Sequence, residues 1–253
     1  MGKNLLNLSL EEKLKYFLVP PRLYMAYRSA KEYKKGEKEI RILNTLVGNK
    51  KNSIDIGANK GVYTYFLAKL SKKVYAFEPN PKVFAFLKKS LPGKAEAFFV
   101  ALSNKDGKDI LRIPRSKRGV SNQGGSLSHQ KVPDNYVAIE IDSKTLDSYS
   151  LKNIGFIKID VEGFEREVLE GAKQTVCREK PNILIEMEER HTKRPIEEDI
   201  KWVENLGYKG FFYTEGEGLK SIDFFDGNKH HRQAYTKDRD NYVFNFIFLP
   251  MIS

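Results

Sequence analysis

The stretch that decides the fold is SIDIGANKG, residues 53–61. It begins as a short apolar strand, turns through Gly57 and Gly61, and continues into a helical pattern at Val62. Glycines in such a turn allow the backbone to approach a ligand closely. The G-x-x-x-G spacing differs from the G-x-G-x-x-G of dinucleotide binders. Asp55 would repel a pyrophosphate but could receive an amino group, so we expect a zwitterionic ligand at this turn.

Outward from this turn, short β-rich runs alternate with helical patterns, which favours an α/β fold with a mostly parallel sheet covered on both faces. The predicted strands are residues 53–56, 74–77, 97–102, 156–160 and 182–187, and the predicted helices are residues 61–70, 81–90 and 163–176. Two further strands, 208–214 and 242–249, are joined by a polar stretch without a strong helical pattern. We expect the last strand to run antiparallel.

The first 50 residues predict a helical extension, followed by one domain over residues 51–253. A capping box at Ser9 and Glu12 starts a helix that ends before Pro20, and helical patterns follow at 22–34 and 37–47. Two long polar segments interrupt the domain, 104–142 with a small β excursion (109–113, 137–141) and 221–240. Segments of this length are typical of lids and binding loops.

Composition limits where and how the chain acts. With 253 residues, 40% hydrophobic and 30% charged, it is long enough for a packed core. A single cysteine, no window that could span a bilayer and no apolar leader predict a cytoplasmic protein. Residues 1–52 carry twelve basic and five acidic side chains, so this region holds +7 of the chain's formal net charge of +11. This basic region could attract an anionic lipid surface, RNA or a nucleotide-sugar phosphate, or could simply confer solubility.

The ends of the next two strands indicate a nucleoside ligand. Glu78 follows the second strand, where a carboxylate can accept hydrogen bonds from both hydroxyls of a ribose. The third strand ends at Ala101-Leu102-Ser103, where an apolar wall and backbone amides could hold an adenine ring. Together with Asp55 these positions predict S-adenosylmethionine.

Seven ordered blocks resemble the FkbM-type S-adenosylmethionine-dependent methyltransferases. They are DIGANKGVYT (55–64), YAFEPNP (75–81), VALSNKDG (100–107), TLDS (145–148), FIKIDVEGFEREVLEGA (156–172), PNILIEM (181–187) and NFIFLP (245–250). The resemblance implies a class I, Rossmann-like sheet of seven strands with the last antiparallel. It also implies methyl transfer to a hydroxyl of a sugar, glycoconjugate or polyhydroxylated natural product. The predicted donor-binding residues are Asp55, Gly57, Asn59, Gly61, Tyr63, Thr64, Glu78, Pro79, Ala101, Leu102, Ser103 and Asp160.

The reaction itself requires alignment of a nucleophile and removal of one proton. The segment KIDVEG, residues 158–163, closes the fourth strand where open α/β sheets bind ligands. We expect Asp160 to face the methyl donor and Glu162 to bind the acceptor hydroxyl or support the loop, unless the two simply cap the next helix with Lys158 as counter-ion. The candidate catalytic residues are Asp160, Glu162, Glu186 and His191, with His129 and the pair His230-His231 as further possible bases. Topology favours the pair, because a loop that leads into an antiparallel last strand emerges at the carboxyl edge of the sheet, above the site. Magnesium could bind Asp160, Glu162 and Glu186, but we predict no obligatory metal.

Two other functions compete with methylation of a small-molecule or glycan acceptor. Aromatic and basic residues near the N-terminus would suit an RNA methyltransferase, but no RNA-binding module is visible, so we expect no nucleic-acid partner. Alternatively, the chain could bind an adenosine ligand without catalysis while its N-terminal helices contact a membrane surface or a protein partner. The amphipathic pattern of residues 10–18 equally fits a helix that packs on the domain.

Overall fold

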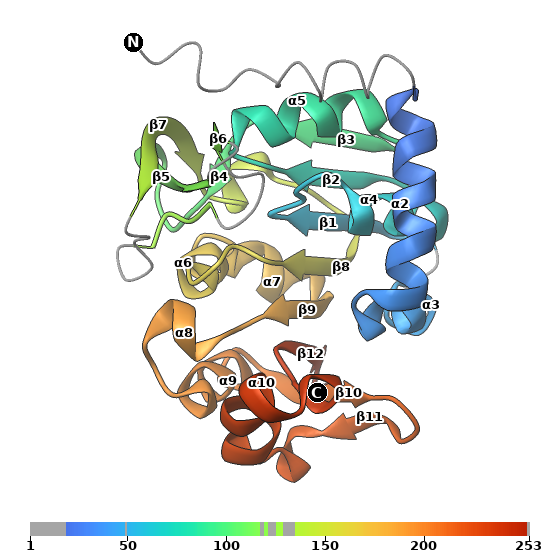
Figure 1. Ribbon diagram of the computed structural model, residues 1–253, viewed down its shortest axis with the longest axis vertical. Helices are drawn as coiled ribbons and strands as arrows, with labels where there is room; N and C mark the ends of the chain where they lie inside the picture. The colour runs from blue at the N-terminus through green and yellow to red at the C-terminus, as the bar shows by residue number, and fades with distance from the viewer. Residues whose placement is uncertain (1–18, 49, 117–118, 121–124, 129–134, 252–253) are drawn as a thin grey trace.

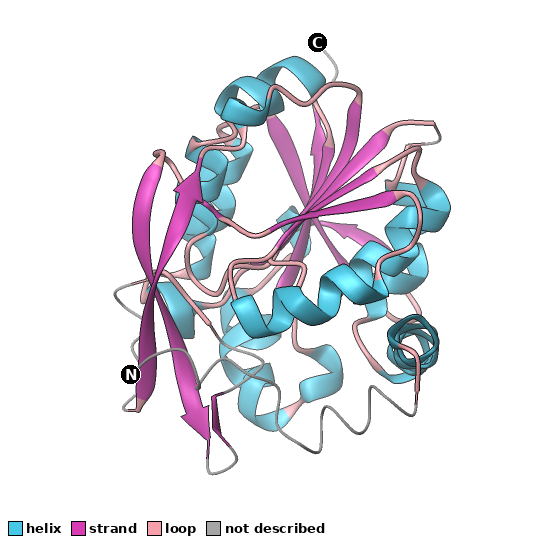
Figure 2. Ribbon diagram, turned by 90° about the horizontal axis from the view of Figure 1, so that it is seen from above, coloured by secondary structure: helices cyan, strands magenta, loops and turns pink. Residues whose placement is uncertain are grey.

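The computed structural model describes residues 19–48, 50–116, 119–120, 125–128 and 135–251. The predicted helix over residues 9–18 and the candidate base His129 lie outside the described residues. One large twisted sheet forms the centre, helices cover both of its faces, and a smaller sheet stands beside it (Figures 1 and 2). The expected α/β architecture is confirmed.

The main sheet has eight strands in the order β11-β10-β12-β9-β8-β1-β2-β3. Five of them are paired in parallel with one another: β1 (Asn52–Ile56), β2 (Val74–Phe77), β3 (Ala95–Phe98), β8 (Ile154–Ile159) and β9 (Asn182–Glu186). The last strand, β12 (Asn245–Pro250), is antiparallel to both of its neighbours, β9 and β10 (Tyr208–Thr214), as expected. A hairpin adds an eighth strand, β11 (Gly218–Ser221), at the edge. In the sheet order, β2 lies beside β1 on one side and β9 lies beside β8 on the other, so the strand order reverses between β1 and β8. Open α/β sheets bind their ligands at the carboxyl ends of the two strands where this reversal occurs.

One face of the main sheet is covered by the N-terminal helices together with α4 and α5. These elements are α2 (Pro21–Lys35), the 3-10 helix η1 (Lys38–Ile42), α3 (Leu43–Leu46), α4 (Val62–Leu70) and α5 (Pro81–Ser90). The ring of Tyr24 on α2 packs edge-on against Phe86 on α5, at 5.7 Å between centroids. Asn80 caps α5, because its Oδ1 accepts hydrogen bonds from the amides of Lys82 and Val83.

The other face is covered by α6 (Glu165–Glu170), α7 (Lys173–Glu179) and α9 (Ile196–Glu204). The prediction of one helix over residues 163–176 is wrong, because the helix is interrupted at Gly171, between α6 and α7. A Cβ on Gly171 would lie 2.0 Å from the carbonyl oxygen of Ser103. The Asp147 carboxylate then caps α7 through the amides of Gln174 and Thr175.

The small sheet contains β4 (Ala101–Leu102), β5 (Gly107–Ser116), β6 (Gly119–Val120) and β7 (Tyr136–Lys144) in the order β4-β7-β5-β6. The predicted β excursion is therefore present and longer than expected. The predicted strand over residues 97–102 is wrong, because β3 ends at Phe98 and Ala101-Leu102 pairs with β7 instead. This switch buries Ala101 in a separate apolar cluster with Leu111, Ile113 and Ile141 of the small sheet.

The segment from residue 221 to 240, expected to lack helices, is helical over most of its length. It holds η3 (Ile222–Phe224), a π-helix η4 (Gly227–Gln233), α10 (Ala234–Lys237) and η5 (Arg239–Asn241). Asp226 caps η4, and Arg232 forms ion pairs with Glu189 of α8 (Glu189–Thr192) and with Glu197 of α9. These tertiary contacts stabilise a helical segment that the polar sequence pattern does not predict. Within the described ranges, no helix combines the length and apolar character needed to cross a membrane.

Candidate active site

The turn after β1 runs directly against the end of β8. Gly57 adopts a φ of 74°, and its amide and that of Ala58 both donate to the carbonyl oxygen of Phe77. A Cβ on Gly57 would lie 1.8 Å from the carbonyl oxygen of Asp160, so only glycine fits there. Gly61, with a φ of 96°, starts α4, and a Cβ there would approach Leu87 of α5 to 2.7 Å. Gly57 therefore lies at the site, and Gly61 serves the packing behind it.

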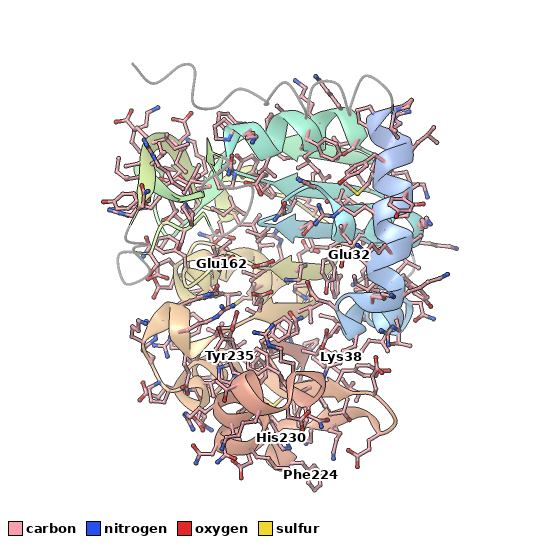
Figure 3. All side chains as sticks on the ribbon, in the orientation of Figure 1. Glu32, Lys38, Glu162, Phe224, His230 and Tyr235 are labelled. Carbon is pink, nitrogen blue, oxygen red and sulfur yellow. The ribbon has the colours of Figure 1, made fainter. Side chains whose placement is uncertain are left out.

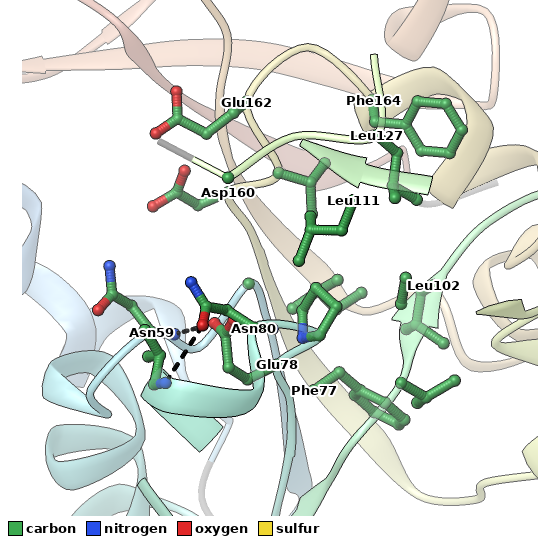
Figure 4. Close-up of a pocket in the computed structure, with 18 residues that line it drawn as sticks. Asn59, Phe77, Glu78, Asn80, Leu102, Leu111, Leu127, Asp160, Glu162 and Phe164 are labelled. Atoms are coloured by element: carbon green, nitrogen blue, oxygen red, sulfur yellow. Dashed lines mark hydrogen bonds between the residues drawn. The ribbon is translucent and has the colours of Figure 1, made fainter. Parts of the chain in front are cut away.

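Glu78 is buried at the end of β2 and joins two turns. Its two carboxylate oxygens accept hydrogen bonds from the amides of Asn59 and Asn80, each at 2.8 Å (Figure 4). Burial raises the pKa of Glu78 to about 7, although the two amides favour the ionised form. Each oxygen retains a second lone pair, so the carboxylate can still accept a ligand hydroxyl.

The first cavity, of about 690 Å³ including its open mouth, lies between these turns and the small sheet. Its polar lining includes Asn59, Glu78 and Asn80, with Pro79 between the last two. Its apolar wall is formed by Phe77, Val100, Ala101, Leu102, Leu111, Leu127 and Phe164 (Figure 4). Sequence reasoning missed Leu111, Leu127 and Phe164. For Leu111, the alternation of apolar residues in the predicted β excursion indicates a buried face. It does not indicate that this face covers a ligand cavity.

Ser103 does not take the place expected for it. The structure places Ala101 and Leu102 in the cavity wall, but Ser103 lines neither of the two cavities. Its amide donates to the carbonyl oxygen of Lys144 on β7 at 2.9 Å. Of the backbone amides expected to be available to an adenine ring, that of Ser103 is not, because the pairing of β4 with β7 already uses it.

The second cavity, of about 950 Å³ including its open mouth, lies on the other side of the β1 turn. Asp55 lines it and is 2% exposed, and the Thr64 hydroxyl donates to Asp55 Oδ2 at 2.5 Å. Burial raises the pKa of Asp55 to about 6. Tyr63 lines the same cavity and donates to Glu37 Oε2 at 2.6 Å. Thr64 lines neither cavity, so it orients Asp55 from behind.

Asp160 and Glu162 line both cavities, and Figure 4 shows their carboxylates on the same side. Lys158 Nζ lies 3.8 Å from Asp160 Oδ2, and burial raises the pKa of Asp160 to about 6. Glu162 has a left-handed φ of 58°, and its carbonyl oxygen accepts a hydrogen bond from Ser126 Oγ at 2.7 Å. The small-sheet segment thus fixes this strained loop at the junction.

The remaining candidates fall into three positions. Glu186 lines the second cavity. His191 is 3% exposed and lines neither cavity, but its Nε2 lies 3.2 Å from Glu162 Oε2, directly behind that carboxylate. His230 and His231 line neither cavity, and Figure 3 shows His230 among the C-terminal elements, well apart from Glu162. Among the described residues no group of three acidic, histidine or cysteine side chains is placed to hold a metal ion.

The expectation that the histidine pair lies above the site is wrong, because the pair is part of the packing between η4 and the strands. The His230 ring packs against Phe212 and Phe225, and its Nδ1 accepts a hydrogen bond from the amide of Asp226. His231 Nδ1 lies 2.7 Å from the carbonyl oxygen of Val243. Arg232 of η4 pairs with Glu189 of α8 and Glu197 of α9, so this segment lies against those helices and its histidines line neither cavity.

Comparison with solved structures finds matches at low sequence identity. An FkbM methyltransferase from Methylobacillus flagellatus is 16% identical with a TM-score of 0.49, over 79% of this chain and 43% of that one. An rRNA methylase from Streptococcus thermophilus is 12% identical with a TM-score of 0.46, over 85% of this chain and 95% of that one. A putative methyltransferase from Streptococcus mutans, solved with SAH, is 10% identical with a TM-score of 0.47, over 85% and 96%. This chain therefore spans less than half of the Methylobacillus protein.

A search of curated proteins finds no match. The model of the methyltransferase FkbM domain matches residues 55–211, which is more than half of the chain and includes both turns of the first cavity. The chain therefore belongs to the FkbM family of S-adenosylmethionine-dependent methyltransferases.

Proposed function

We propose that the protein transfers a methyl group from S-adenosylmethionine to a hydroxyl of a sugar, a glycoconjugate or another polyhydroxylated small molecule. One observation carries this proposal: the two cavities share Gly57, Asn59, Asp160 and Glu162 in their linings. A donor with its nucleoside in the first cavity would extend its methionine part past Gly57 to Asp55, and would thus meet an acceptor in the rest of the second cavity beside two carboxylates. A methyl transfer needs this arrangement, because its two reactants must align in one line.

The first cavity has the chemistry that the donor requires. The Glu78 carboxylate would accept hydrogen bonds from the ribose hydroxyls, and the apolar wall around Leu102 and Leu111 would hold the adenine ring. Gly57 lines both cavities, so its backbone lies where the two meet. Asp55, held by Thr64, would receive the amino group of the methionine part. When bound, S-adenosylmethionine supplies a methyl group that its sulfonium has already activated.

The acceptor side needs a group that takes the hydroxyl proton. Glu162 would accept it, because this carboxylate lies at the junction of the two cavities. His191 is a positioning residue that holds Glu162 from behind. Glu188, 3.9 Å from His191 Nε2, is fixed in turn by Arg190 and Tyr242. Asp160, paired with Lys158, would orient the reactants.

The test separates donor binding from turnover. Calorimetry with S-adenosylhomocysteine measures donor-site affinity, and transfer of a labelled methyl group to a panel of glycosides measures turnover. We expect Glu78→Ala and Asp55→Ala to weaken donor binding. Glu162→Gln should retain donor binding and lower turnover by about 100-fold, within the usual range for loss of a general base.

His230→Asn is the matched control, because the structure places His230 away from both cavities. This variant should keep the turnover of the unmodified protein. A folded protein that gives no binding heat with S-adenosylhomocysteine, or a Glu162→Gln variant with full turnover, would contradict the proposal.

A further inference from the structure

Polar side chains from four neighbouring strands form a row across the carboxyl end of the main sheet. Asp55 and Lys158 are register partners on β1 and β8, and Glu186 at the end of β9 pairs with Asn245 on β12. Because side chains alternate between the two faces of a sheet, this row lies on the face that α4 and η1 cover. Three of its members, Asp55, Lys158 and Glu186, line the second cavity and form its floor.

Glu37 closes the cavity from the N-terminal side. It lies between α2 and η1, and its Oε2 accepts hydrogen bonds from Tyr63 at 2.6 Å and from Asn245 at 2.9 Å. Since Asn245 is the register partner of Glu186, the carboxylates of Glu37 and Glu186 lie at the same end of the cavity. A segment outside the strand-and-turn motifs thus contributes a charge to the proposed acceptor site.

The second cavity holds more negative than positive side chains. Its described lining contains the carboxylates of Glu32, Glu37, Asp55, Asp160, Glu162 and Glu186. The cations in that lining are Arg28, Lys60 and Lys158. Arg28 lies 3.9 Å from Glu32, and Lys158 lies 3.8 Å from Asp160. Among the described residues, neither Glu37 nor Glu186 has an ion-pair partner.

A bound donor would not neutralise these two carboxylates if its amino group is received by Asp55. Two carboxylates close together in a cavity repel each other, and a cation between them removes that cost through charge-assisted hydrogen bonds. We propose that the acceptor carries a protonated amine, as an amino sugar unit does, and that Glu37 and Glu186 bind this ammonium while a hydroxyl of the same molecule faces Glu162. This inference rests on the proposed methyl transfer and names its acceptor class.

The protonation of Glu186 provides an independent readout. Burial, then the carboxylates of Asp160, Glu37 and Glu162, raise the pKa of Glu186 well above its usual value, against the opposing effect of Lys158. An ammonium beside Glu186 would favour the ionised carboxylate and so lower this pKa again. Calorimetry in buffers of different ionisation enthalpy measures the proton release that accompanies such a change.

The experiment uses the full chain loaded with S-adenosylhomocysteine and three probes that differ at one group. They are methyl glucosaminide, its N-acetyl derivative and methyl glucoside. We expect the amine to bind at least 10-fold more tightly than the other two, with proton release. Glu37→Gln and Glu186→Gln should each reduce this preference at least 5-fold, because glutamine keeps the shape and an acceptor oxygen but removes the charge.

Glu217→Gln is the control, since Glu217 pairs with Lys220 in the exposed β10–β11 turn and lines neither cavity. It should keep the full preference for the amine. Equal affinity for the three probes, no binding of the amine at millimolar concentration, or an unchanged preference in both cavity variants would overturn the inference. Donor affinity is measured on the same samples, so loss of S-adenosylhomocysteine binding by the unmodified protein would instead count against the proposed function.

Discussion

Replacement of Gly57 by alanine tests the contact between β1 and β8 that the whole site depends on. The φ of 74° costs a residue with a Cβ about 1–2 kcal/mol. The new Cβ would also lie 1.8 Å from the carbonyl oxygen of Asp160, which belongs to the backbone and cannot rotate away. Forcing backbone apart in a packed interior costs about 1–3 kcal/mol more. We therefore expect Gly57→Ala to lower the free energy of unfolding by about 2–5 kcal/mol.

Gly216→Ala separates the two contributions. Gly216 has a φ of 90° in the β10–β11 turn, and a Cβ there would meet nothing within 4 Å. This control should lose about 1–2 kcal/mol through backbone strain alone. Urea unfolding followed by circular dichroism compares the two variants, and calorimetry with S-adenosylhomocysteine should show weaker binding for Gly57→Ala only. If the two variants lose equal stability and bind the ligand equally, the close approach of β1 to β8 is not as described.

Three further predictions follow from individual contacts. Thr64→Val removes the hydroxyl that holds the buried Asp55 carboxylate, so it should lower the free energy of unfolding by about 1–3 kcal/mol and weaken S-adenosylhomocysteine binding. Thr64→Ser should keep both the stability and the affinity, which thermal unfolding and calorimetry measure. Folding raises the pKa of Glu78 from 4.5 to about 7, so the folded protein binds this proton more strongly than the unfolded chain does. The stability that this contributes is present below pH 4.5 and is lost as the pH rises through 7. Glu78→Gln should therefore make the midpoint of unfolding less dependent on pH between these values. Asp147→Ala removes the cap of α7 and should cost about 1–2 kcal/mol in urea unfolding while S-adenosylhomocysteine affinity stays unchanged.

The parts of the site that lie at strand ends could be predicted from the sequence. Short apolar runs followed by glycine or proline mark where β1 and β2 end, and parallel strands bring their carboxyl ends to one edge of a sheet. Asp55 and Glu78 were therefore predictable as neighbours of one site, and the structure brings each of them to a cavity there. The antiparallel β12 was predictable for a similar local reason, since a hairpin-like link precedes it.

The parts that depend on long-range packing could not be predicted. Leu127 reaches the first cavity because the small sheet folds back over the turn after β2, and no local pattern specifies that contact. Glu37 reaches the second cavity through Asn245, more than 200 residues away in the chain. The histidine pair was predicted near the site from topology alone. The ion pairs of Arg232 with α8 and α9 direct that segment elsewhere.

The alternation of side chains along β1 explains how one strand serves two cavities. Asp55 lines the second cavity and Ile56 lines the first, because neighbouring residues in a strand point to opposite faces. The next residue, Gly57, has no side chain, and it lines both. A side chain at this position would collide with the carbonyl oxygen of Asp160 and push the ends of β1 and β8 apart. The requirement for glycine therefore serves the chemistry through the packing, because only a close approach of these two strand ends brings Asp160 and Glu162 to the place where the two cavities meet.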